Sequence, residues 1–480
     1  MASSSLFFVL LLFLISAGSQ SQGSFLKLQI FRQTPSVDLH QALRADAVRH
    51  NSISSSPLVS AAISGSGQYL VHFKVGTPAQ TIALVADTGS DLVWVRCSAC
   101  RTRPCFLRHP LGSVFFPRAS ASFAPFHCYD SHCRLVPPDI TTASHLKCNR
   151  SGEGPARLHT PCHYRYSYAD LSSSSGFFSH DSATVENAVS GIPVKFSSVA
   201  FGCGFRNSGP SFSSGVGAHG VMGLGRGPTS FPSQLGNNFG NVFSYCLKDY
   251  TISPPPISYL LIGGDVRQHQ QQHSRRHQFS RTYNESFHHL SFTPLLNSAL
   301  SPSFYYVGVE CVTVDGNPLT IEPSVFALDN TTGSGGTVLD SGTTLSFLPE
   351  VAYRQILAEM ERIVRLPRVS IGAAGTGSGD PDPANPSPAF DLCVNVTGLG
   401  GKQLPRLGLK FRGGAVYSPP PRNYFVEAGD GVRCLALQPV APSKSDSGFG
   451  VLGNLMQQGF LFVFDRDQNR VGFSRTGCTS

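Results

Sequence analysis

A short acidic motif occurs once in each half of the chain. Asp87-Thr88-Gly89-Ser90 follows an apolar run, and Asp340-Ser341-Gly342-Thr343 follows another. The glycine permits a tight turn, so each aspartate is expected at the end of a strand. One such tetrapeptide also suits an ordinary turn. Two copies, each after an apolar run, favour a pair of carboxylates that an internal duplication brings together.

A second repeated pattern supports the duplication. Gly220-Val221-Met222-Gly223-Leu224-Gly225 follows the first aspartate, and Gly450-Val451-Leu452-Gly453-Asn454 follows the second. Each half therefore has the order apolar run, Asp, hydroxyl residue, Gly, and then an apolar-apolar-Gly strand. The length of 480 residues suits two lobes of about 200 residues each.

Taken together, these residues resemble the pepsin-like aspartic proteases. The resemblance extends from Gln68 to Cys478, and the cysteine spacing is similar to that of the plant nepenthesin-type subgroup. It implies an all-β, bilobal fold with lobes related by a pseudo-twofold axis and a few short helices. The composition agrees, because charged residues make up only 14% while Gly (48) and Pro (34) are plentiful, as in β-rich, turn-rich proteins.

The chain is expected to have five parts. The apolar run 6–15 before small residues predicts a signal peptide, because it is too short to span a bilayer. The Ser-rich segment after it is a propeptide by resemblance, and the mature fold is expected to open near Gly67. The expected boundaries are 1–19 for the signal peptide, 20–64 for the propeptide, 65–250 for the N-terminal catalytic lobe, 251–290 for a linker with a His/Gln-rich insertion (267–289), and 291–480 for the C-terminal catalytic lobe.

Apolar periodicity predicts a few further elements. Pro349–Leu366 carries apolar residues on one helical face and is the best helix pattern in the chain. A shorter helix is expected around Gln234. Residues 460–465 and 470–473 predict a closing hairpin.

Two paired carboxyl groups can hydrolyse a peptide bond. Held about 3 Å apart, they cannot both ionise and so share one proton. The charged group then accepts a proton from water, while the neutral one donates a hydrogen bond to the scissile carbonyl. We therefore predict Asp87 and Asp340 as the catalytic pair. The resemblance assigns orienting roles to their neighbours: hydroxyls that bond the carboxylates (Ser90, Thr343), hydroxyls that lock the two loops together (Thr88, Ser341) and turn glycines (Gly89, Gly342).

A tyrosine-rich segment resembles the flap of this family, a hairpin that closes over the substrate. Tyr164, Tyr166 and Tyr168 alternate along a predicted strand and so face one side, with 172–176 at the expected tip. Trp94, the only tryptophan, matches the family residue whose indole N–H bonds the flap tyrosine. We predict Tyr166 as that tyrosine, with Tyr168 as the alternative.

The 13 cysteines agree with an oxidising compartment. Spacing alone leaves the pairing open, and the close set Cys97, Cys100 and Cys105 is also compatible with zinc, although a secreted chain favours disulfides. The pairing that the resemblance implies leaves Cys311 without a partner, and this residue is interpreted as a buried, inert strand thiol. The resemblance implies six disulfides: Cys97–Cys100, Cys105–Cys203, Cys128–Cys162, Cys133–Cys148, Cys246–Cys478 and Cys393–Cys434.

Two further patterns concern modification and metal binding. Four Asn-x-Ser/Thr sequons in loop-like contexts are candidate glycosylation sites: Asn149, Asn284, Asn330 and Asn395. His269, His273 and His277 have the i, i+4 spacing of a helical metal site, but the segment lacks an apolar face to hold a helix. No metal is therefore predicted.

These features predict a secreted aspartic endopeptidase with an acid pH optimum and no cofactor. We expect a monomer that acts on a peptide or protein, located in the extracellular space or cell wall, with the vacuole as the alternative. The dispersed net charge of +8 disfavours nucleic-acid binding, and no later run predicts a membrane anchor. Two rival interpretations are an inactive binding protein similar to plant xylanase inhibitors, and a carbohydrate-processing enzyme with two carboxylates, which would not require the duplicated motif.

Overall fold

The computed structural model describes most of the chain between Phe25 and Cys478. The described residues are 25–32, 39, 41–47, 67–100, 113–137, 160–168, 172–186, 191–209, 219–249, 251–252, 256–264, 290–370, 390–398, 404–429, 431–440 and 449–478. The predicted signal peptide (1–19), the candidate glycosylation sites Asn149 and Asn284, and the insertion 267–289 with its three histidines lie outside these residues.

Short strands dominate both halves of the chain. The N-terminal half contains β1 (Phe25–Arg32), β2 (Tyr69–Val75), β3 (Gln80–Asp87), β4 (Trp94–Arg96), β5 (Ala124–Pro125), β6 (His163–Ser167), β7 (Ser173–Glu186), β8 (Pro193–Ser208), β9 (Gly220–Gly223), α6 (Phe231–Phe239), β10 (Val242–Cys246) and β11 (Ser258–Gly263). The C-terminal half contains β12 (Ser291–Leu296), β13 (Tyr306–Val307), β14 (Val309–Val314), β15 (Asn317–Pro318), β16 (Thr337–Leu339), β17 (Ser346–Leu348), α9 (Glu350–Ile363), β18 (Cys393–Asn395), β19 (Leu407–Phe411), β20 (Val416–Tyr417), β21 (Phe425–Glu427), β22 (Val432–Leu435), β23 (Leu437–Pro439), β24 (Gly450–Leu452), α10 (Asn454–Gln457), β25 (Leu461–Asp465) and β26 (Arg470–Ser474).

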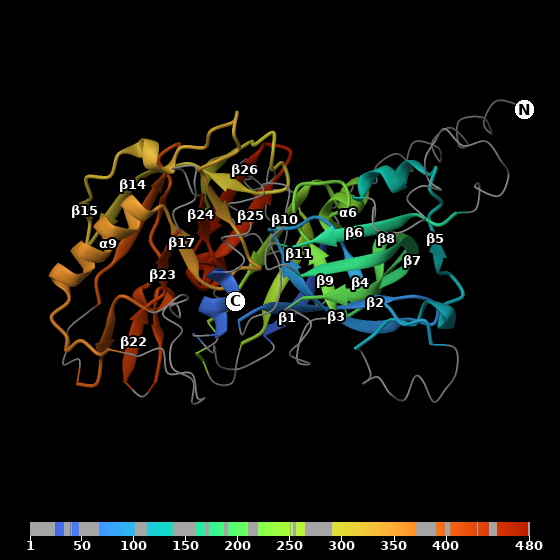
Figure 1. Ribbon diagram of the computed structural model, residues 1–480, viewed down its shortest axis with the longest axis horizontal. Coiled ribbons are helices and arrows are strands. Elements are labelled where there is room, and N and C mark those ends of the chain that lie inside the picture. Colours follow the sequence, from blue (N-terminus) through green and yellow to red (C-terminus); the bar gives the residue numbers. More distant parts are fainter. Residues whose placement is uncertain are drawn as a thin grey trace, which may run out of the picture.

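An antiparallel run of strands joins the two halves (Figure 1). Its order is β2, β1, β11, β10, β25, β26, β12, so the last strands of the N-terminal half pair directly with the last strands of the C-terminal half. At the junction, Phe243 of β10 lies opposite Phe464 of β25, and their stacked rings have centroids 4.6 Å apart. Both side chains are fully buried, so backbone hydrogen bonds and apolar contact together fix the halves.

The same three-strand arrangement occurs in each half. β3 runs parallel to β9, which also pairs antiparallel with β4; β16 runs parallel to β24, which also pairs antiparallel with β17. In both halves the first strand leads into the aspartate motif, and the middle strand is the apolar-apolar-Gly repeat. The predicted duplication and the all-β, two-lobed fold are therefore confirmed.

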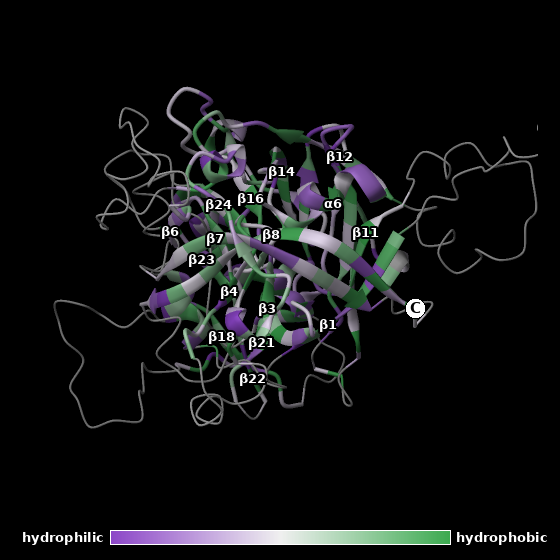
Figure 2. Ribbon diagram, turned by 90° about the vertical axis from the view of Figure 1, so that its right-hand side faces the viewer, coloured by the Kyte–Doolittle hydropathy of each residue, from purple (hydrophilic) through white to green (hydrophobic). Residues whose placement is uncertain are grey.

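The strand that carries the first aspartate is buried on both faces. Leu84 and Ala86 of β3 point into the main core, while Val85 packs in a separate cluster with Trp94 and Tyr164. Hydrophobic residues likewise gather on strands in the middle of the molecule, including β3, β16 and β24 (Figure 2). Because close packing leaves such a strand little freedom, Asp87 starts from a rigid support.

The predicted helices and closing hairpin are present. The buried residues of α9, on the outer side of the C-terminal half in Figure 1, include Ile356 and Met360 of the predicted apolar face. The helix α6 contains Gln234 and is capped at its N-terminus by Ser230, whose side chain accepts a hydrogen bond from the N–H of Ser233. The closing hairpin is β25 and β26.

One strand was not predicted from the sequence. β1 lies in the segment assigned to the propeptide, and it pairs with β11 on one side and with β2 on the other. Its side chains Leu26, Leu28 and Ile30 alternate into the core, as the period of a strand requires. The fold of the full chain therefore begins well before Gly67.

The structure corrects part of the disulfide pairing. Cys246–Cys478 and Cys393–Cys434 are present as the resemblance implied. Cys97, however, is bonded to Cys203, and this excludes the implied pairs Cys97–Cys100 and Cys105–Cys203. The reason is the parallel pairing of β4 with β8, which places the two Cα atoms 5.4 Å apart.

A second correction concerns Cys133 and Cys162, which are bonded to each other with their Cα atoms 5.7 Å apart. This excludes the implied pairs Cys128–Cys162 and Cys133–Cys148. Cys133 lies on a short 3₁₀ helix (Ser131–Leu135), which brings it to the start of β6. Cys100 and Cys128 are also disulfide-bonded, and their pairing falls outside the described residues.

Three remaining predictions concern single residues. Cys311 is free, as predicted, but it is half-buried rather than buried, since the β14–β19 ladder has a bulge between Val309 and Cys311. Asn330 is exposed in a turn, as expected for a glycan acceptor. Asn395 instead ends the strand β18, where its Oδ1 accepts a hydrogen bond of 2.8 Å from the N–H of Thr397.

Peptide mapping of the non-reduced protein should recover the pairs Cys97–Cys203 and Cys133–Cys162. Strand pairing and the short helix place these sulfurs together, so no rearrangement is needed. The measurement is mass spectrometry of a proteolytic digest in which free thiols are first alkylated at acid pH, and Cys246–Cys478 serves as the internal control. A peptide that links Cys97 to Cys100 would contradict this pairing.

Candidate active site

The two aspartates occupy equivalent positions at the strand ends. Asp87 is the last residue of β3, and Asp340 directly follows β16; both are fully buried. The N–H of Gly89 donates to Oδ1 of Asp87 at 3.0 Å, and the N–H of Gly342 donates to Oδ1 of Asp340 at 2.8 Å. Each carboxylate is thus bonded by the turn that follows it.

A hydroxyl group satisfies the other oxygen of each carboxylate. Oγ of Ser90 donates to Oδ2 of Asp87, and Oγ1 of Thr343 donates to Oδ2 of Asp340. These are the bonds that the resemblance led us to expect. Because buried carboxylates need donors, the hydroxyls fix the direction of both groups.

The two aspartate loops are locked together by reciprocal hydrogen bonds. The N–H of Thr88 donates to Oγ of Ser341 at 3.0 Å, and the N–H of Ser341 donates to Oγ1 of Thr88 at 2.9 Å. Each hydroxyl then donates onward, from Thr88 to the carbonyl of Leu339 at 3.0 Å and from Ser341 to that of Ala86 at 2.8 Å. These bonds join residues from opposite halves of the chain and fasten the two aspartate loops to each other.

The repeated glycines have a steric reason. A Cβ atom on Gly223 would lie 2.2 Å from the carbonyl oxygen of Asp91, and one on Gly453 would lie 1.9 Å from that of Leu345. In each half the backbone just after the aspartate loop therefore crosses the glycine at a distance that only glycine permits. The apolar-apolar-Gly pattern marks this crossing.

The tyrosine hairpin requires a correction. The indole N–H of Trp94 donates to the hydroxyl of Tyr168, not to that of Tyr166. The hydroxyl of Tyr166 instead accepts a hydrogen bond of 3.3 Å from the N–H of Asp91. The period-two alternation correctly predicted that Tyr166 and Tyr168 lie on one face of the strand. The residue that contacts Trp94, however, is Tyr168, the alternative in our prediction.

The hairpin tip also differs from the prediction. Residues 173–176, expected at the tip, are paired with β6, since Tyr166 lies opposite Ser174 and Tyr164 opposite Gly176. Tyr164 is buried and its hydroxyl lies 2.9 Å from Oγ of Ser174. Burial raises the pKa of Tyr168 well above its ordinary value, so this phenol stays protonated at neutral pH.

Sequence reasoning missed Asp91, the residue just after the first motif. Its carboxylate accepts a hydrogen bond of 2.8 Å from the N–H of Gly227 and another from Oγ of Ser303, a residue of the C-terminal half. A Cβ atom on Gly225 or Gly227 would lie 2.3 or 2.2 Å from the Asp91 oxygens, so two glycines make room for this group. Burial raises the pKa of the Asp91 carboxyl, and the two hydrogen bonds oppose that rise.

Sequence reasoning also missed Asp46, which lies in the predicted propeptide. Residues 41–47 are helical, and the Asp46 carboxylate accepts hydrogen bonds from the N–H groups of Thr344 at 3.0 Å and Leu345 at 2.8 Å. Leu43 packs in a cluster with Phe347. The N-terminal segment is therefore anchored directly beyond the second aspartate motif.

Comparison with known proteins agrees with this geometry. Family models described as "Xylanase inhibitor N-terminal" and "Xylanase inhibitor C-terminal" match residues 69–264 and 304–475. The chain is 32% identical over 415 residues to aspartic proteinase nepenthesin-1 of Nepenthes gracilis, which covers 86% of this chain and 79% of that protein. It is 34% identical over 427 residues to aspartyl protease family protein 2 of Arabidopsis thaliana, which covers 88% of this chain and 74% of the relative. The chain belongs to the pepsin-like plant aspartic protease family.

Solved structures with the same fold include two basic 7S globulins. Conglutin gamma from lupine seeds superposes with a TM-score of 0.63 at 18% identity, covering 94% of this chain and 95% of that one. Basic 7S globulin from soybean superposes with a TM-score of 0.60 at 20% identity, covering 95% and 97%. At these identities the likeness concerns the pepsin-like fold alone.

Two features are absent from the described residues of this aspartic protease family member. No group of three or more His, Cys, Asp or Glu side chains among them could hold a metal ion. Within the same residues, no helix has the length and apolar character needed to cross a bilayer. The two carboxyl groups of the site, oriented by their donors, can accept and donate protons.

Replacing Tyr168 with Phe should shift the fluorescence of Trp94 to shorter wavelength. Trp94 is the only tryptophan, and this change removes the hydroxyl that accepts its indole N–H. Tyr166→Phe is the matched control and should leave the emission maximum in place, because that hydroxyl bonds the backbone of Asp91. Equal shifts in both variants would show that the tryptophan contact is assigned to the wrong tyrosine.

Asp91→Asn should gain stability relative to the parent as the pH rises from about 3 to about 7. The pKa of the Asp91 carboxyl in the folded protein is raised above its ordinary value of 3.8, so the protonated carboxyl stabilises the folded parent. This stabilisation is complete below pH 3.8 and is lost as the pH rises through the folded-state pKa. Asparagine does not titrate, and the Tm of the variant minus that of the parent should therefore increase with pH. Asp315→Asn, an exposed site, is the control; a constant difference for Asp91→Asn would contradict the raised pKa.

Proposed function

We propose that this protein is a secreted aspartic endopeptidase that hydrolyses peptide bonds with a water activated by Asp87 and Asp340. The observation that carries the proposal is the complete set of donors around both carboxylates, with Ser90 and Thr343 bonded to them and the two loops interlocked. A chain that no longer needed the carboxylates would have no physical reason to keep two oriented acids buried, since burying them costs free energy.

The proposed reaction uses one proton shared by the two acids. The charged carboxylate takes a proton from water, and the resulting hydroxide attacks the carbonyl carbon while the neutral carboxyl donates to the carbonyl oxygen. Collapse of this intermediate breaks the C–N bond, and the amine leaves with a proton from the pair. The pair must carry one proton, so activity is expected at acid pH.

The proposed substrate is an extended peptide. An extended chain would place alternate side chains into pockets on opposite sides, and apolar side chains are the expected preference. The hairpin of β6 and β7 would close over it, with Tyr166 and Tyr168 facing the first catalytic loop through Asp91 and Trp94. Closure excludes water other than the nucleophile.

The remaining features of the proposal follow from the sequence. The run 6–15 supports secretion through a signal peptide ending near residue 19, to the extracellular space or cell wall. We propose a monomeric glycoprotein with Asn330 as an accessible acceptor, with no cofactor and no nucleic-acid partner. The contacts of β1 and Asp46 support an inactive precursor in which these two parts of the expected propeptide are docked on the lobes.

A second candidate function is non-catalytic binding. The matching family models are named for xylanase inhibitors, and the solved neighbours named above are basic 7S globulins. The retained donors around both carboxylates favour catalysis over this alternative.

Asp87→Asn and Asp340→Asn should each lower kcat/KM by at least about 100-fold, because each removes one partner of the shared proton. The assay is cleavage of denatured haemoglobin or a quenched peptide at acid pH after activation, with and without pepstatin. Asp315→Asn is the matched control and should keep the parental rate.

Two outcomes would count against the proposal. If either variant at position 87 or 340 kept more than about a tenth of the activity with an unchanged Tm, the shared-proton mechanism would be wrong. If the parent were folded but inert, and bound a polysaccharide-degrading enzyme instead, the non-catalytic alternative would hold.

A further inference from the structure

A cavity lies in the N-terminal half, outside the aspartate motifs. Its volume is about 510 Å³, which is within the range of small-molecule sites, roughly 300–1,000 Å³. Its walls come from strands β6, β7 and β8 and from the short 3₁₀ helix Pro117–Ala119. The aspartate motifs contribute none of the described residues that line it.

The cavity lies behind the tyrosine hairpin. His163 and Phe177 are directly opposite each other in the β6–β7 ladder, and both line the cavity. Tyr164 is the next residue along β6 and points to the other face, where it packs in the cluster of Trp94. The hairpin therefore presents its tyrosines to the aspartate loops and its opposite face to the cavity.

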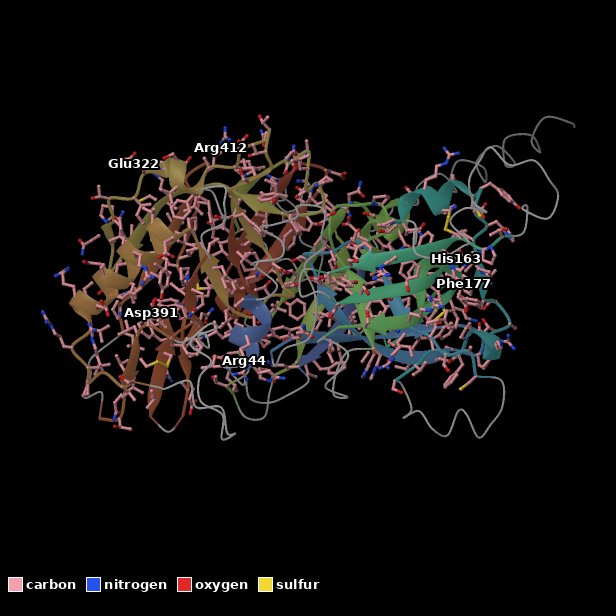
Figure 3. The ribbon with its side chains drawn as sticks, viewed as in Figure 1. Arg44, His163, Phe177, Glu322, Asp391 and Arg412 are labelled. Atoms are coloured by element: carbon pink, nitrogen blue, oxygen red, sulfur yellow. A yellow bond between two sulfur atoms is a disulfide. The ribbon has the colours of Figure 1, made fainter. Side chains whose placement is uncertain are left out.

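Aromatic rings form much of the cavity wall. The rings of His163 and Phe177, both labelled in Figure 3, meet edge to face with centroids 4.7 Å apart. The ring of Phe177 meets that of Phe205 in the same manner, with centroids 5.5 Å apart. Phe123 lines another part. All four side chains remain partly exposed. Rings in this arrangement favour a flat apolar group, which can stack on one and meet the edge of another.

The polar part of the wall carries positive charge. Arg118 on the short 3₁₀ helix and Arg206 on β8 both line the cavity and are exposed. No Asp or Glu is among the described residues that line it. A guanidinium group bonds a carboxylate through two parallel hydrogen bonds, so the charge selects an anion and disfavours a cation.

We propose that this cavity is a second ligand site, which binds a small carboxylic acid with an aromatic ring. The ring would lie among Phe123, Phe177 and Phe205, and the carboxylate would face Arg118 and Arg206. Binding at this site does not depend on peptide cleavage, so the site stands or fails separately from the proposed protease activity.

Occupation of the cavity would support the hairpin from behind. Two of the walls are the hairpin strands themselves, and Gly176 of β7 sits where a Cβ atom would lie 1.9 Å from the carbonyl oxygen of Cys203. The β7–β8 ladder has a bulge at this point, between Ser175 and Gly176. A ligand that fills the space beside the β7–β8 bulge would restrain β7, the strand that pairs with Tyr166 of β6.

Calorimetric titration of the full chain near pH 6 and low salt, with 3-phenylpropanoate, tests the site. We expect saturable binding of one equivalent, because the probe carries both the ring and the carboxylate. The alcohol 3-phenylpropan-1-ol has the same ring without the charge and should bind about fivefold more weakly or worse. Absence of saturable binding of the acid at millimolar concentration, or equal binding of the alcohol, would overturn the proposal.

Single substitutions locate the binding. Arg118→Gln and Arg206→Gln should each lower the affinity for the acid by about threefold to fivefold, since an exposed ion pair contributes modestly to binding. The affinity for the alcohol should stay unchanged. Arg412→Gln, an exposed arginine on the other half of the molecule (Figure 3), is the matched control. Equal affinity of all three variants for the acid would place its binding elsewhere and overturn the assignment.

Removal of the ring separates stacking from charge. Phe177→Leu keeps an apolar side chain on a partly exposed strand position, so the Tm should hold, while the affinities for acid and alcohol should fall together. Hydrogen exchange of amides 163–168 should also slow when 3-phenylpropanoate is bound to the parent chain, and at a concentration near the parental Kd it should slow less in Arg206→Gln. Unchanged exchange in the parent at saturation would overturn the support of the hairpin.

Discussion

The structure depends most on the reciprocal hydrogen bonds between Thr88 and Ser341. Each residue donates its N–H to the other's hydroxyl, and each hydroxyl donates to a backbone carbonyl of the opposite strand end. Neither loop can complete this arrangement alone. The paired β10 and β25 strands bring the two halves close enough for the bonds to form. The buried carboxylates of Asp87 and Asp340 are consequently oriented by donors whose positions are set by both halves of the chain.

The first aspartate loop serves three neighbours at once. Thr88 bonds the second aspartate loop. The N–H of Asp91 donates a hydrogen bond to the hydroxyl of Tyr166, and the Asp91 carboxylate accepts one from Ser303 of the other half. A shift of this loop would therefore alter the hairpin and the junction of the halves together. This sharing explains why glycines crowd around it, since Gly223, Gly225 and Gly227 leave room only for backbone and for one acid.

The sequence was informative where a physical rule acts locally. The duplicated motif indicated the pair of aspartates, because turn chemistry and strand periodicity are short-range properties, while the family resemblance supplied their donors and the two-lobed fold. It failed where the answer depends on which strands meet. Cys97 is near Cys100 in sequence, but the β4–β8 pairing sets it beside Cys203. Alternation put Tyr166 and Tyr168 on one face, yet only the register decides which one reaches Trp94. The alternating Leu26, Leu28 and Ile30 were a readable signal for β1 that the Ser-rich surroundings obscured.

The position of β1 affects how any cut in the segment that follows it would be observed. Residues 25–32 are an inner strand, paired with β11 from Phe25 to Ile30 and with β2 from Ile30 to Arg32. A chain severed between residues 33 and 66 would still hold this strand through its ladders and through the buried side chains of Leu26 and Leu28. The severed molecule would migrate as one particle in gel filtration and separate into two polypeptides only in denaturant. The size measured by native gel filtration therefore does not show whether the chain has been cut.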